Sequence, residues 1–293
     1  MTKILDKWVR AMEYKRILTI QDISCVGQCS LTVALPILSA CGLETAVIPS
    51  AVLSTHTAFK NFSFRDLSDD ILVITEHWEK ENIYFSAIYT GYLGSAKQIA
   101  FVKDIFPKVL KENGKIIVDP AMADNGKLYP GFDSAFVEEM KKLVSSADII
   151  LPNITEAALL TGLEYCEQYG ESYINRLTSS LHALGVPTVI LTGVGYDSGF
   201  SGVVVSENGE TNYYRHKKID RVCHGTGDVF AAAFTGAYLS GKSSFHSSVI
   251  AADYTVNCIQ YTVSDTEHWY GVKFEPLLPF MIQTDTILTL IFF

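Results

Sequence analysis

The sequence predicts one three-layer α/β/α domain built on a mostly parallel β-sheet. Three observations support this fold class: short β-branched runs alternate with longer helix-like stretches, one pair of runs flanks a hairpin turn, and polar or turn-forming residues follow the runs. The chain has 293 residues, of which 48% are hydrophobic, so it can bury a core of the size that such a domain needs.

Six short runs, rich in β-branched and apolar residues, have the length of buried strands. They cover residues 17–20, 45–48, 87–89, 115–118, 148–151 and 188–191. Each run is separated from the next by enough chain for a crossover helix, which a parallel connection requires. The alternation therefore predicts parallel strands with helices packed against the sheet.

One pair of runs departs from this alternation. Residues 202–205 and 211–214 flank a short segment that contains Asn208-Gly209. Asn-Gly is the strongest short-range hairpin signal, because both residues accept the positive φ angles that a tight turn needs. We therefore expect an antiparallel hairpin attached to the parallel sheet.

The chain contains no Pro- or Ser-rich linker and no internal repeat, which favours a single domain. We expect the domain at residues 16–280, an N-terminal extension at 1–15 and a C-terminal tail at 281–293. The tail ends in Ile-Leu-Thr-Leu-Ile-Phe-Phe, which is far shorter than the roughly 20 residues of a membrane-spanning helix. The first residues lack the continuous apolar stretch of a signal peptide, so no membrane association is expected.

Charge and cysteine usage exclude several classes of partner. The 23 Lys and Arg residues face 32 Asp and Glu residues, and a net charge of −9 argues against binding to nucleic acid or anionic lipid. The six cysteines form no Cys-x-x-Cys pair and are scattered through a large chain. This distribution is typical of a reducing compartment and predicts a cytoplasmic protein.

Polar or turn-forming residues follow each predicted strand. Among them are Asp22 after the first strand, Asp119 after the fourth and Asn153 after the fifth. In open α/β sheets, ligands bind just outside the carboxyl ends of the strands, so these residues indicate one shared cleft. The alternative is that they are ordinary polar loop residues, and the pattern by itself leaves both interpretations open.

The segment that begins at Gly225 contains the first candidate catalytic and anion-binding residues. Gly225, Thr226 and Gly227 directly precede a helix-forming stretch, so their backbone N–H groups can converge on an anion at a helix N-terminus. A fixed carboxylate at Asp228 would repel a phosphate unless it had a separate role, and that role is general base for a hydroxyl attacking the γ-phosphate. The alternative is a simple capped helix start. The segment is neither a Walker A loop nor a dinucleotide fingerprint.

Two further groups of oxygen ligands follow predicted strands. Asn153 and Glu156 are three residues apart at the start of a helix and can face the same cleft, where they could hold Mg²⁺ through its waters. The alternative is a helix cap with Glu near the start. Asp119 and Asp124 lie close together after another strand and are candidate cation ligands or, alternatively, turn carboxylates.

Taken together, these motifs resemble those of the ribokinase-like superfamily, whose members share the G-x-G-D and N-x-x-E signatures. Several motifs narrow the resemblance to the pyridoxal kinase family and occur in that family's order across roughly residues 16–280. They are Ile17-Leu18-Thr19-Ile20-Gln21-Asp22, Ser54-Thr55-His56-Thr57, Thr90-Gly91-Tyr92, Val118-Asp119-Pro120, Ile150-Leu151-Pro152-Asn153 and His224-Gly225-Thr226-Gly227-Asp228.

The resemblance implies a ribokinase-like fold, ATP as co-substrate and transfer of a phosphoryl group to the 5′-hydroxymethyl group of a B6 vitamer. It also implies Mg²⁺, a monovalent cation (K⁺ or Na⁺) and a homodimer, with no nucleic-acid or membrane partner. The residue roles that it implies are Asp228 as catalytic base; Gly225, Thr226 and Gly227 as the anion hole; Asn153, Glu156 and Thr192 at the ATP phosphates; Asp119, Asp124 and Glu156 around the metal; and Asp22, Thr57 and Tyr92 around the pyridine ring. Residues 124–131 match a mobile loop that closes over the nucleotide.

Two other functions are compatible with the motifs. One is hydroxymethylpyrimidine (phosphate) kinase, a neighbour in the superfamily, although many of its members have Cys where this chain has Asp228. The other is a non-catalytic nucleotide- or vitamin-binding relative, which would be expected to lack Asp228 or the Asn153–Glu156 pair. Many pyridoxal kinases have Ser where this chain has Asp22, so the resemblance leaves the preferred vitamer open.

Overall fold

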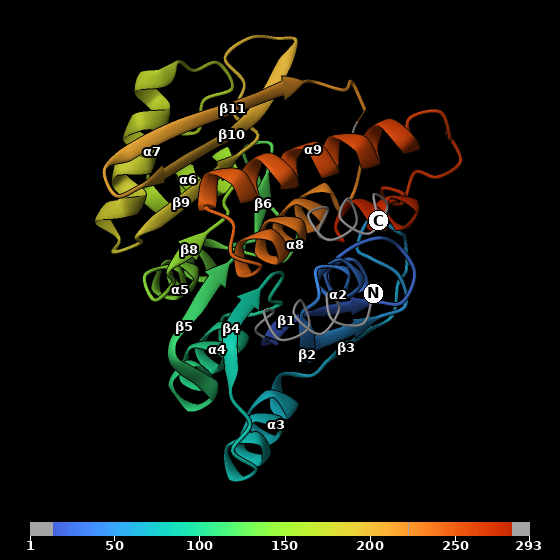
Figure 1. Ribbon diagram of the computed structural model, residues 1–293, viewed down its shortest axis with the longest axis vertical. Helices are drawn as coiled ribbons and strands as arrows, with labels where there is room; N and C mark the ends of the chain where they lie inside the picture. Colours follow the sequence, from blue (N-terminus) through green and yellow to red (C-terminus); the bar gives the residue numbers. More distant parts are fainter. Residues whose placement is uncertain (1–13, 222, 283–293) are drawn as a thin grey trace, which may run out of the picture.

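The computed structural model describes residues 14–221 and 223–282 and contains a nine-stranded sheet (Figure 1). Its strands lie in the order β11-β10-β9-β8-β5-β4-β1-β2-β3. Their bounds are β1 (Arg16–Ser24), β2 (Glu44–Leu53), β3 (Phe64–Asp66), β4 (Phe85–Thr90), β5 (Leu110–Val118), β8 (Ile149–Ile150), β9 (Thr188–Thr192), β10 (Phe200–Glu207) and β11 (Glu210–Lys217). The neighbouring strands β9, β8, β5, β4, β1 and β2 pair in parallel, whereas β3 at one edge and β10 and β11 at the other pair antiparallel. The predicted fold class and all six predicted parallel strands are confirmed.

Helices cover both faces of the sheet, which gives the three predicted layers (Figure 1). The helices of one layer are α3 (Ser68–Lys80), α4 (Ala96–Val109), α5 (Ser134–Val144), α6 (Ile154–Thr161) and α7 (Glu171–Ala183). The helices of the other are α2 (Leu31–Ala40), α8 (Thr226–Leu239), α9 (Ser244–Thr262) and the 3₁₀ helix η1 (Glu275–Phe280). Figure 1 shows α9 lying alongside α8.

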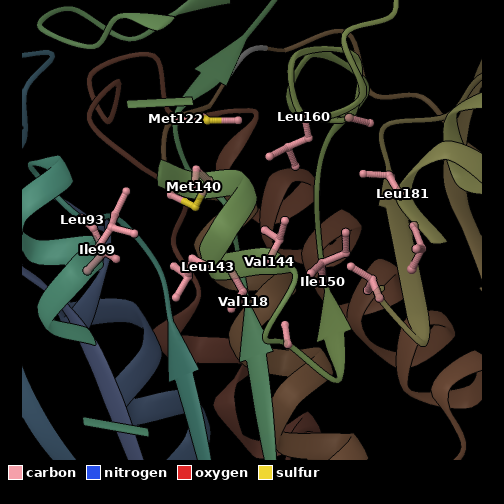
Figure 2. Packing of buried hydrophobic residues seen from close by; sticks show 14 of the residues in the cluster. Leu93, Ile99, Val118, Met122, Met140, Leu143, Val144, Ile150, Leu160 and Leu181 are labelled. Carbon is pink, nitrogen blue, oxygen red and sulfur yellow. The ribbon is translucent and has the colours of Figure 1, made fainter. Parts of the chain in front are cut away.

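The core is divided in two because successive side chains of a strand point to opposite faces. In β1, Leu18 and Ile20 join the cluster under α3–α7, whereas Ile17 joins the cluster under α2, α8 and α9. Figure 2 shows the first cluster, in which Val118 and Ile150 of neighbouring strands pack against helix residues. Because both faces of the sheet are buried, the central strands have continuous apolar sequences.

Helix α8 is held deep in the second layer by its small residues. A Cβ atom added at Gly236 would lie 2.4 Å from Sγ of Cys41, at the end of α2, so the two helices approach each other closely. Most side chains of α8 are buried, which fixes the direction of its N-terminus. Asp228, in the first turn of α8, therefore stands on a rigid support.

Two tight hairpins among the described residues turn at Asn-Gly pairs. The predicted one joins β10 to β11 through Asn208 (φ 54°) and Gly209 (φ 80°), and the prediction is confirmed. A second, smaller hairpin joins β6 (Ala123–Asp124) to β7 (Lys127–Leu128) through Asn125 (φ 50°) and Gly126 (φ 76°). We did not predict it, although the same dipeptide marks it in the sequence.

The expected extension and tail fall outside the described residues, except for residues 14–15 and 281–282. Met281 is buried in the second core cluster, directly after η1. Among the described helices, none combines the length and apolar character needed to cross a membrane.

Candidate active site

The carboxyl ends of the central parallel strands lie at one edge of the sheet. Backbone hydrogen bonds join residues at or just after the ends of neighbouring strands. Gly91 N–H donates to Ile20 O (3.2 Å), Asp119 N–H to Thr90 O (2.9 Å) and Thr192 N–H to Pro152 O (2.9 Å). Residues that lie far apart in the sequence are therefore placed side by side. This edge carries most of the chemistry-bearing residues that the sequence singles out.

Several carboxylates gather at this edge and repel one another. Burial raises the pKa of Asp119 well above its usual range, and the charges of Glu156 and Asp228 raise it further. The charge of Asp22 in turn raises the pKa of Asp228, so this acidic cluster (Asp22, Asp119, Glu156 and Asp228) is electrostatically connected. Such a concentration of negative charge favours the binding of cations or protons over the binding of a bare phosphate.

Asp228 lies in the first turn of α8, directly after the glycine-rich segment. Gly225 is the N-cap residue and adopts a left-handed conformation with φ 76°. The first N–H groups of a helix have no intrahelical acceptor, so those at the start of α8 are available to an anion. Backbone N–H groups without intrahelical acceptors and a carboxylate are thus combined at one helix end.

The pKa of the Asp228 carboxyl group is raised to about 7, mainly by burial. A hydrogen bond from the backbone N–H of Ser30 opposes this shift, and the charge of Asp22 adds to it. A carboxylate with a pKa near neutrality is well suited to accept a proton from an alcohol and release it again.

This pKa predicts a pH dependence of catalysis. Asp228 accepts a proton only when it is unprotonated, so kcat/KM should be maximal above about pH 7 and should fall about tenfold per unit below that value. Initial rates measured from pH 5.5 to 9 at fixed ionic strength test this expectation. A flat profile across that range would contradict the assignment of Asp228 as the base.

Asn153 and Glu156 form a complete capping box at the start of α6. The Asn153 side chain accepts from Glu156 N–H, and Glu156 Oε2 accepts from Asn153 N–H, each at 2.9 Å. Glu156 Oε1 also accepts from Met122 N–H (3.1 Å), and its side chain is buried. The cap interpretation of these residues is therefore realised, and the carboxylate ties the segment after β5 to the start of α6.

The Glu156 contacts predict the effect of an isosteric change. Glu156→Gln replaces one acceptor oxygen by an NH₂ group that faces backbone N–H donors, so buried groups lose their partners. We expect a loss of about 1–3 kcal/mol in the free energy of unfolding and a higher Mg²⁺ requirement. Urea unfolding and a magnesium titration of the rate measure the two effects. An unchanged magnesium titration would contradict a role near the metal, whatever the change in stability.

Asp119 and Asp124 differ in their surroundings. Asp119 is buried at the end of β5, whereas Asp124 is exposed in the β6–β7 hairpin and accepts from Asn125 N–H at 2.8 Å. Within residues 14–221 and 223–282, no three His, Cys, Asp or Glu side chains are close enough to hold a metal ion by themselves. The donors present are hard oxygens, which fit Mg²⁺ when substrate phosphates complete its coordination.

The residues expected around a pyridine ring come from β1 (Asp22), from the β2–β3 connection (Thr57) and from the segment after β4 (Tyr92). Asp22 is 4% exposed and accepts from Ser24 Oγ at 3.1 Å. Burial and the charge of Asp22 raise the pKa of Tyr92, so these two side chains share one region. Tyr92 stacks on Phe132 with ring centroids 5.6 Å apart. Thr57 is exposed and forms no hydrogen bond with any other described residue.

His56 is a structural element of the site that the sequence did not reveal. Its Nδ1 must accept from Ala58 N–H (3.2 Å), so Nε2 carries the proton and donates to Tyr270 O (2.9 Å). Its ring lies against His224, with centroids 5.2 Å apart. A Cβ atom added at Gly27 would lie 2.1 Å from His56 Cδ2. Neutral His56 thus joins its own segment to those of Gly27, Tyr270 and His224, the last of which directly precedes Gly225.

Thr192 lies at the end of β9, next to the start of α6. Its Oγ1 donates to Pro152 O at 3.3 Å. The loop that follows is held by Tyr169, whose hydroxyl accepts from Gly195 N–H (3.1 Å) and donates to Gly193 O (3.4 Å). Tyr169 was missed in the sequence because it lies in the connection between α6 and α7, and only the fold brings it to this loop.

The fold and the position of Asp228 define the class of protein: a small-molecule kinase of the ribokinase-like superfamily. Comparison with known proteins agrees with this class. The profile of the phosphomethylpyrimidine kinase family matches residues 40–272. The pyridoxal kinase of Sus scrofa is 30% identical over 240 residues, which cover 74% of this chain and 73% of the pig protein.

Two solved structures are similar over nearly the whole chain. A putative phosphomethylpyrimidine kinase from Bacteroides thetaiotaomicron VPI-5482, crystallised with pyridoxal, is 33% identical, covers 92% of this chain and 96% of its own, and has a TM-score of 0.87. The pyridoxal kinase from Lactobacillus plantarum is 29% identical, with coverages of 94% and 99% and a TM-score of 0.86. The chain belongs to the phosphomethylpyrimidine kinase family and, within it, to the pyridoxal kinases.

Proposed function

We propose that this protein is a pyridoxal kinase, which transfers the γ-phosphoryl group of ATP to the 5′-hydroxymethyl group of pyridoxal, pyridoxine or pyridoxamine. The observation that carries this proposal is the half-buried Asp228 carboxylate, with its raised pKa, at the N-terminus of α8. The Bacteroides thetaiotaomicron protein, which was crystallised with pyridoxal, supports the same class of substrate. The reaction would salvage vitamin B6.

The reaction assigns separate tasks to the carboxylate and to the amides of this helix end. Asp228 accepts the proton of the attacking hydroxyl as the new O–P bond forms, and ADP leaves from the opposite side of the phosphorus atom. The N–H groups of Gly225, Thr226 and Gly227 bind the oxygens of the migrating phosphoryl group. The positive end of the α8 dipole stabilises the same charge.

The nucleotide lies on the β5, β8 and β9 side of Asp228 in this proposal. Thr192 and Asn153 contact the phosphates, while Asp119, Asp124 and Glu156 attract Mg²⁺ directly or through its waters. Mg²⁺, when bound, neutralises phosphate charge. The buried carboxylate of Asp119 also provides a suitable ligand for K⁺ or Na⁺.

The vitamin ring lies on the β1 and β4 side. Asp22, Thr57 and Tyr92 line it, and the buried carboxyl group of Asp22 favours a ring nitrogen that can carry a proton. Residues 124–131 close over the nucleotide and exclude water, which would otherwise hydrolyse ATP. The resemblance to the family also supports a cytoplasmic homodimer with one kinase domain at residues 16–280.

Hydroxymethylpyrimidine (phosphate) kinase is the second candidate, because the matching family profile is described as phosphomethylpyrimidine kinase. The two substrates share a flat ring with a hydroxymethyl group. They differ in the ring nitrogens that Asp22 would meet. The named pyridoxal kinases among the relatives favour the B6 substrate.

A substrate panel tests the proposal directly. Purified protein is incubated with ATP, Mg²⁺ and one of pyridoxal, pyridoxine, pyridoxamine or hydroxymethylpyrimidine, and ADP release is measured. We expect turnover with at least one B6 vitamer and a lower kcat/KM with the pyrimidine. Faster turnover of the pyrimidine would favour the second candidate. ATP binding without turnover of any alcohol would indicate a non-catalytic relative.

A further inference from the structure

Ser30 has an unusual backbone conformation for a residue that is not glycine. It precedes α2 with φ 55° and ψ −129°, and it is only 5% exposed. L-residues rarely adopt positive φ because Cβ approaches the backbone, and such strain persists only where the surrounding structure enforces it. The position of this residue beside the proposed active site requires an explanation.

The side chain of Ser30 does not play the role that its position suggests. Serine is strongly preferred at the N-cap, where its hydroxyl normally accepts from a backbone N–H of the first helical turn. Among the described residues, no such side-chain hydrogen bond caps α2, although Ser30 O accepts from Ala34 N–H at 2.9 Å. The strained conformation therefore turns the hydroxyl away from the helix that it precedes.

Both polar groups of Ser30 lie close to carboxylates. Ser30 forms an isolated antiparallel bridge with Ile23, the residue directly after Asp22. Burial raises the pKa of both Asp22 and Asp228, while the Ser30 hydroxyl lowers that of Asp22 and the Ser30 backbone N–H lowers that of Asp228. The segment that contains Ser30 also packs closely against the start of α8. A Cβ atom added at Gly225 would lie 1.8 Å from Gln28 O. One residue thus connects the end of β1 with the start of α8.

We propose that Ser30 is a positioning residue, which holds the catalytic base Asp228 and the ring-binding carboxyl group of Asp22 in one fixed arrangement. This inference rests on the proposed function, because it takes Asp228 as the base and Asp22 as a ring contact. The positive φ of Ser30 orients its amide and its hydroxyl toward the two carboxylates in this proposal. Fixing both groups sets the distance between the ring and the base, on which proton transfer depends.

Substitution of Ser30 by alanine and by glycine distinguishes the effect of the hydroxyl from the effect of the backbone strain. Ser30→Ala removes the hydroxyl and keeps Cβ, whereas Ser30→Gly removes the hydroxyl and also accepts the positive φ without strain. We expect both variants to lower kcat for pyridoxal by about tenfold to a hundredfold, with KM for ATP changed by less than about twofold. Ser30→Gly should also have a higher thermal midpoint than Ser30→Ala although both lose activity, so relief of the strain would not restore turnover.

Two control variants test whether the expected loss of kcat is specific to Ser30. Ser24→Ala removes the other hydroxyl that donates to Asp22, and we expect a higher KM for pyridoxal with little loss of kcat. Asn82→Gly introduces glycine at the same φ of 55° after α3, away from the site, and should leave kcat unchanged.

The outcomes that would overturn the inference are distinct. A normal kcat in Ser30→Ala or Ser30→Gly, in a wild type that phosphorylates pyridoxal, would overturn the role of Ser30 alone. An equal loss of kcat in Ser24→Ala would show that any hydroxyl beside Asp22 has the same effect. That result would also overturn a specific role for Ser30 between Asp22 and Asp228. A wild-type protein that turns over no alcohol would overturn the proposed function, and this inference with it.

Discussion

Asp228→Asn is expected to lower kcat by about 10² to 10⁴ while leaving ATP affinity nearly unchanged. The amide has the same shape as the carboxylate but cannot accept the proton of the attacking hydroxyl. ATP affinity should persist because the N–H groups at the start of α8 and the residues after β5, β8 and β9 remain in place. Steady-state rates with pyridoxal and direct measurement of ATP binding separate the two effects.

The stability of this variant provides its control. Asp228 is half-buried near other carboxylates and its pKa is raised, so removing its charge should not lower the free energy of unfolding. A well-folded Asp228→Asn protein with near-normal turnover would exclude Asp228 as the base. Loss of activity together with loss of fold would instead indicate a structural role for this side chain.

Gly225→Ala is expected to have the largest effect on stability. The new Cβ atom would lie 1.8 Å from Gln28 O, and a backbone atom cannot rotate away as a side chain can. The φ of 76° adds left-handed strain. We expect a loss on the order of 3 kcal/mol in the free energy of unfolding. Turnover should also fall, because residues 27–30 must separate from the start of α8.

Gly227→Ala is the matched control for stability. No atom of the described residues lies within 4 Å of a Cβ atom at Gly227, and its φ is not in the left-handed region. Alanine favours the helix, so we expect equal or greater stability for this variant. Urea unfolding of both variants gives the comparison. A Gly225→Ala protein as stable as Gly227→Ala would show that the loop and the helix do not pack as closely as the structure indicates.

The sequence predicted the parallel sheet because its buried strands form continuous apolar runs between longer helical segments. The hairpin at Asn208-Gly209 was predicted because that turn requires positive φ at both residues. The edge strand β3 (Phe64–Asp66) was missed because three exposed residues have no periodicity to detect. The hairpin at Asn125-Gly126 was also missed, although the same dipeptide was present; its strands of two residues each carry no pattern.

The candidate site was predictable where local sequence determines it. Glycines followed by Asp228 at the start of a helix carry their own physical meaning, and so does the spacing of Asn153 and Glu156. Ser30 and His56 were not predictable in the same way. The role of Ser30 depends on its positive φ, and that of His56 on contacts with His224 and Tyr270, which only the folded chain brings near it.

The proposed site draws Asp22 from β1, Asp119 from the end of β5 and Asp228 from α8, so its parts span most of the chain. During synthesis, a ribosome-bound fragment that has completed the strands up to β9 still lacks the base and the anion-binding amides. Such a fragment cannot catalyse the transfer, even if its sheet has already assembled. Catalytic competence therefore requires the synthesis of α8, which follows all the strands of the sheet in the chain.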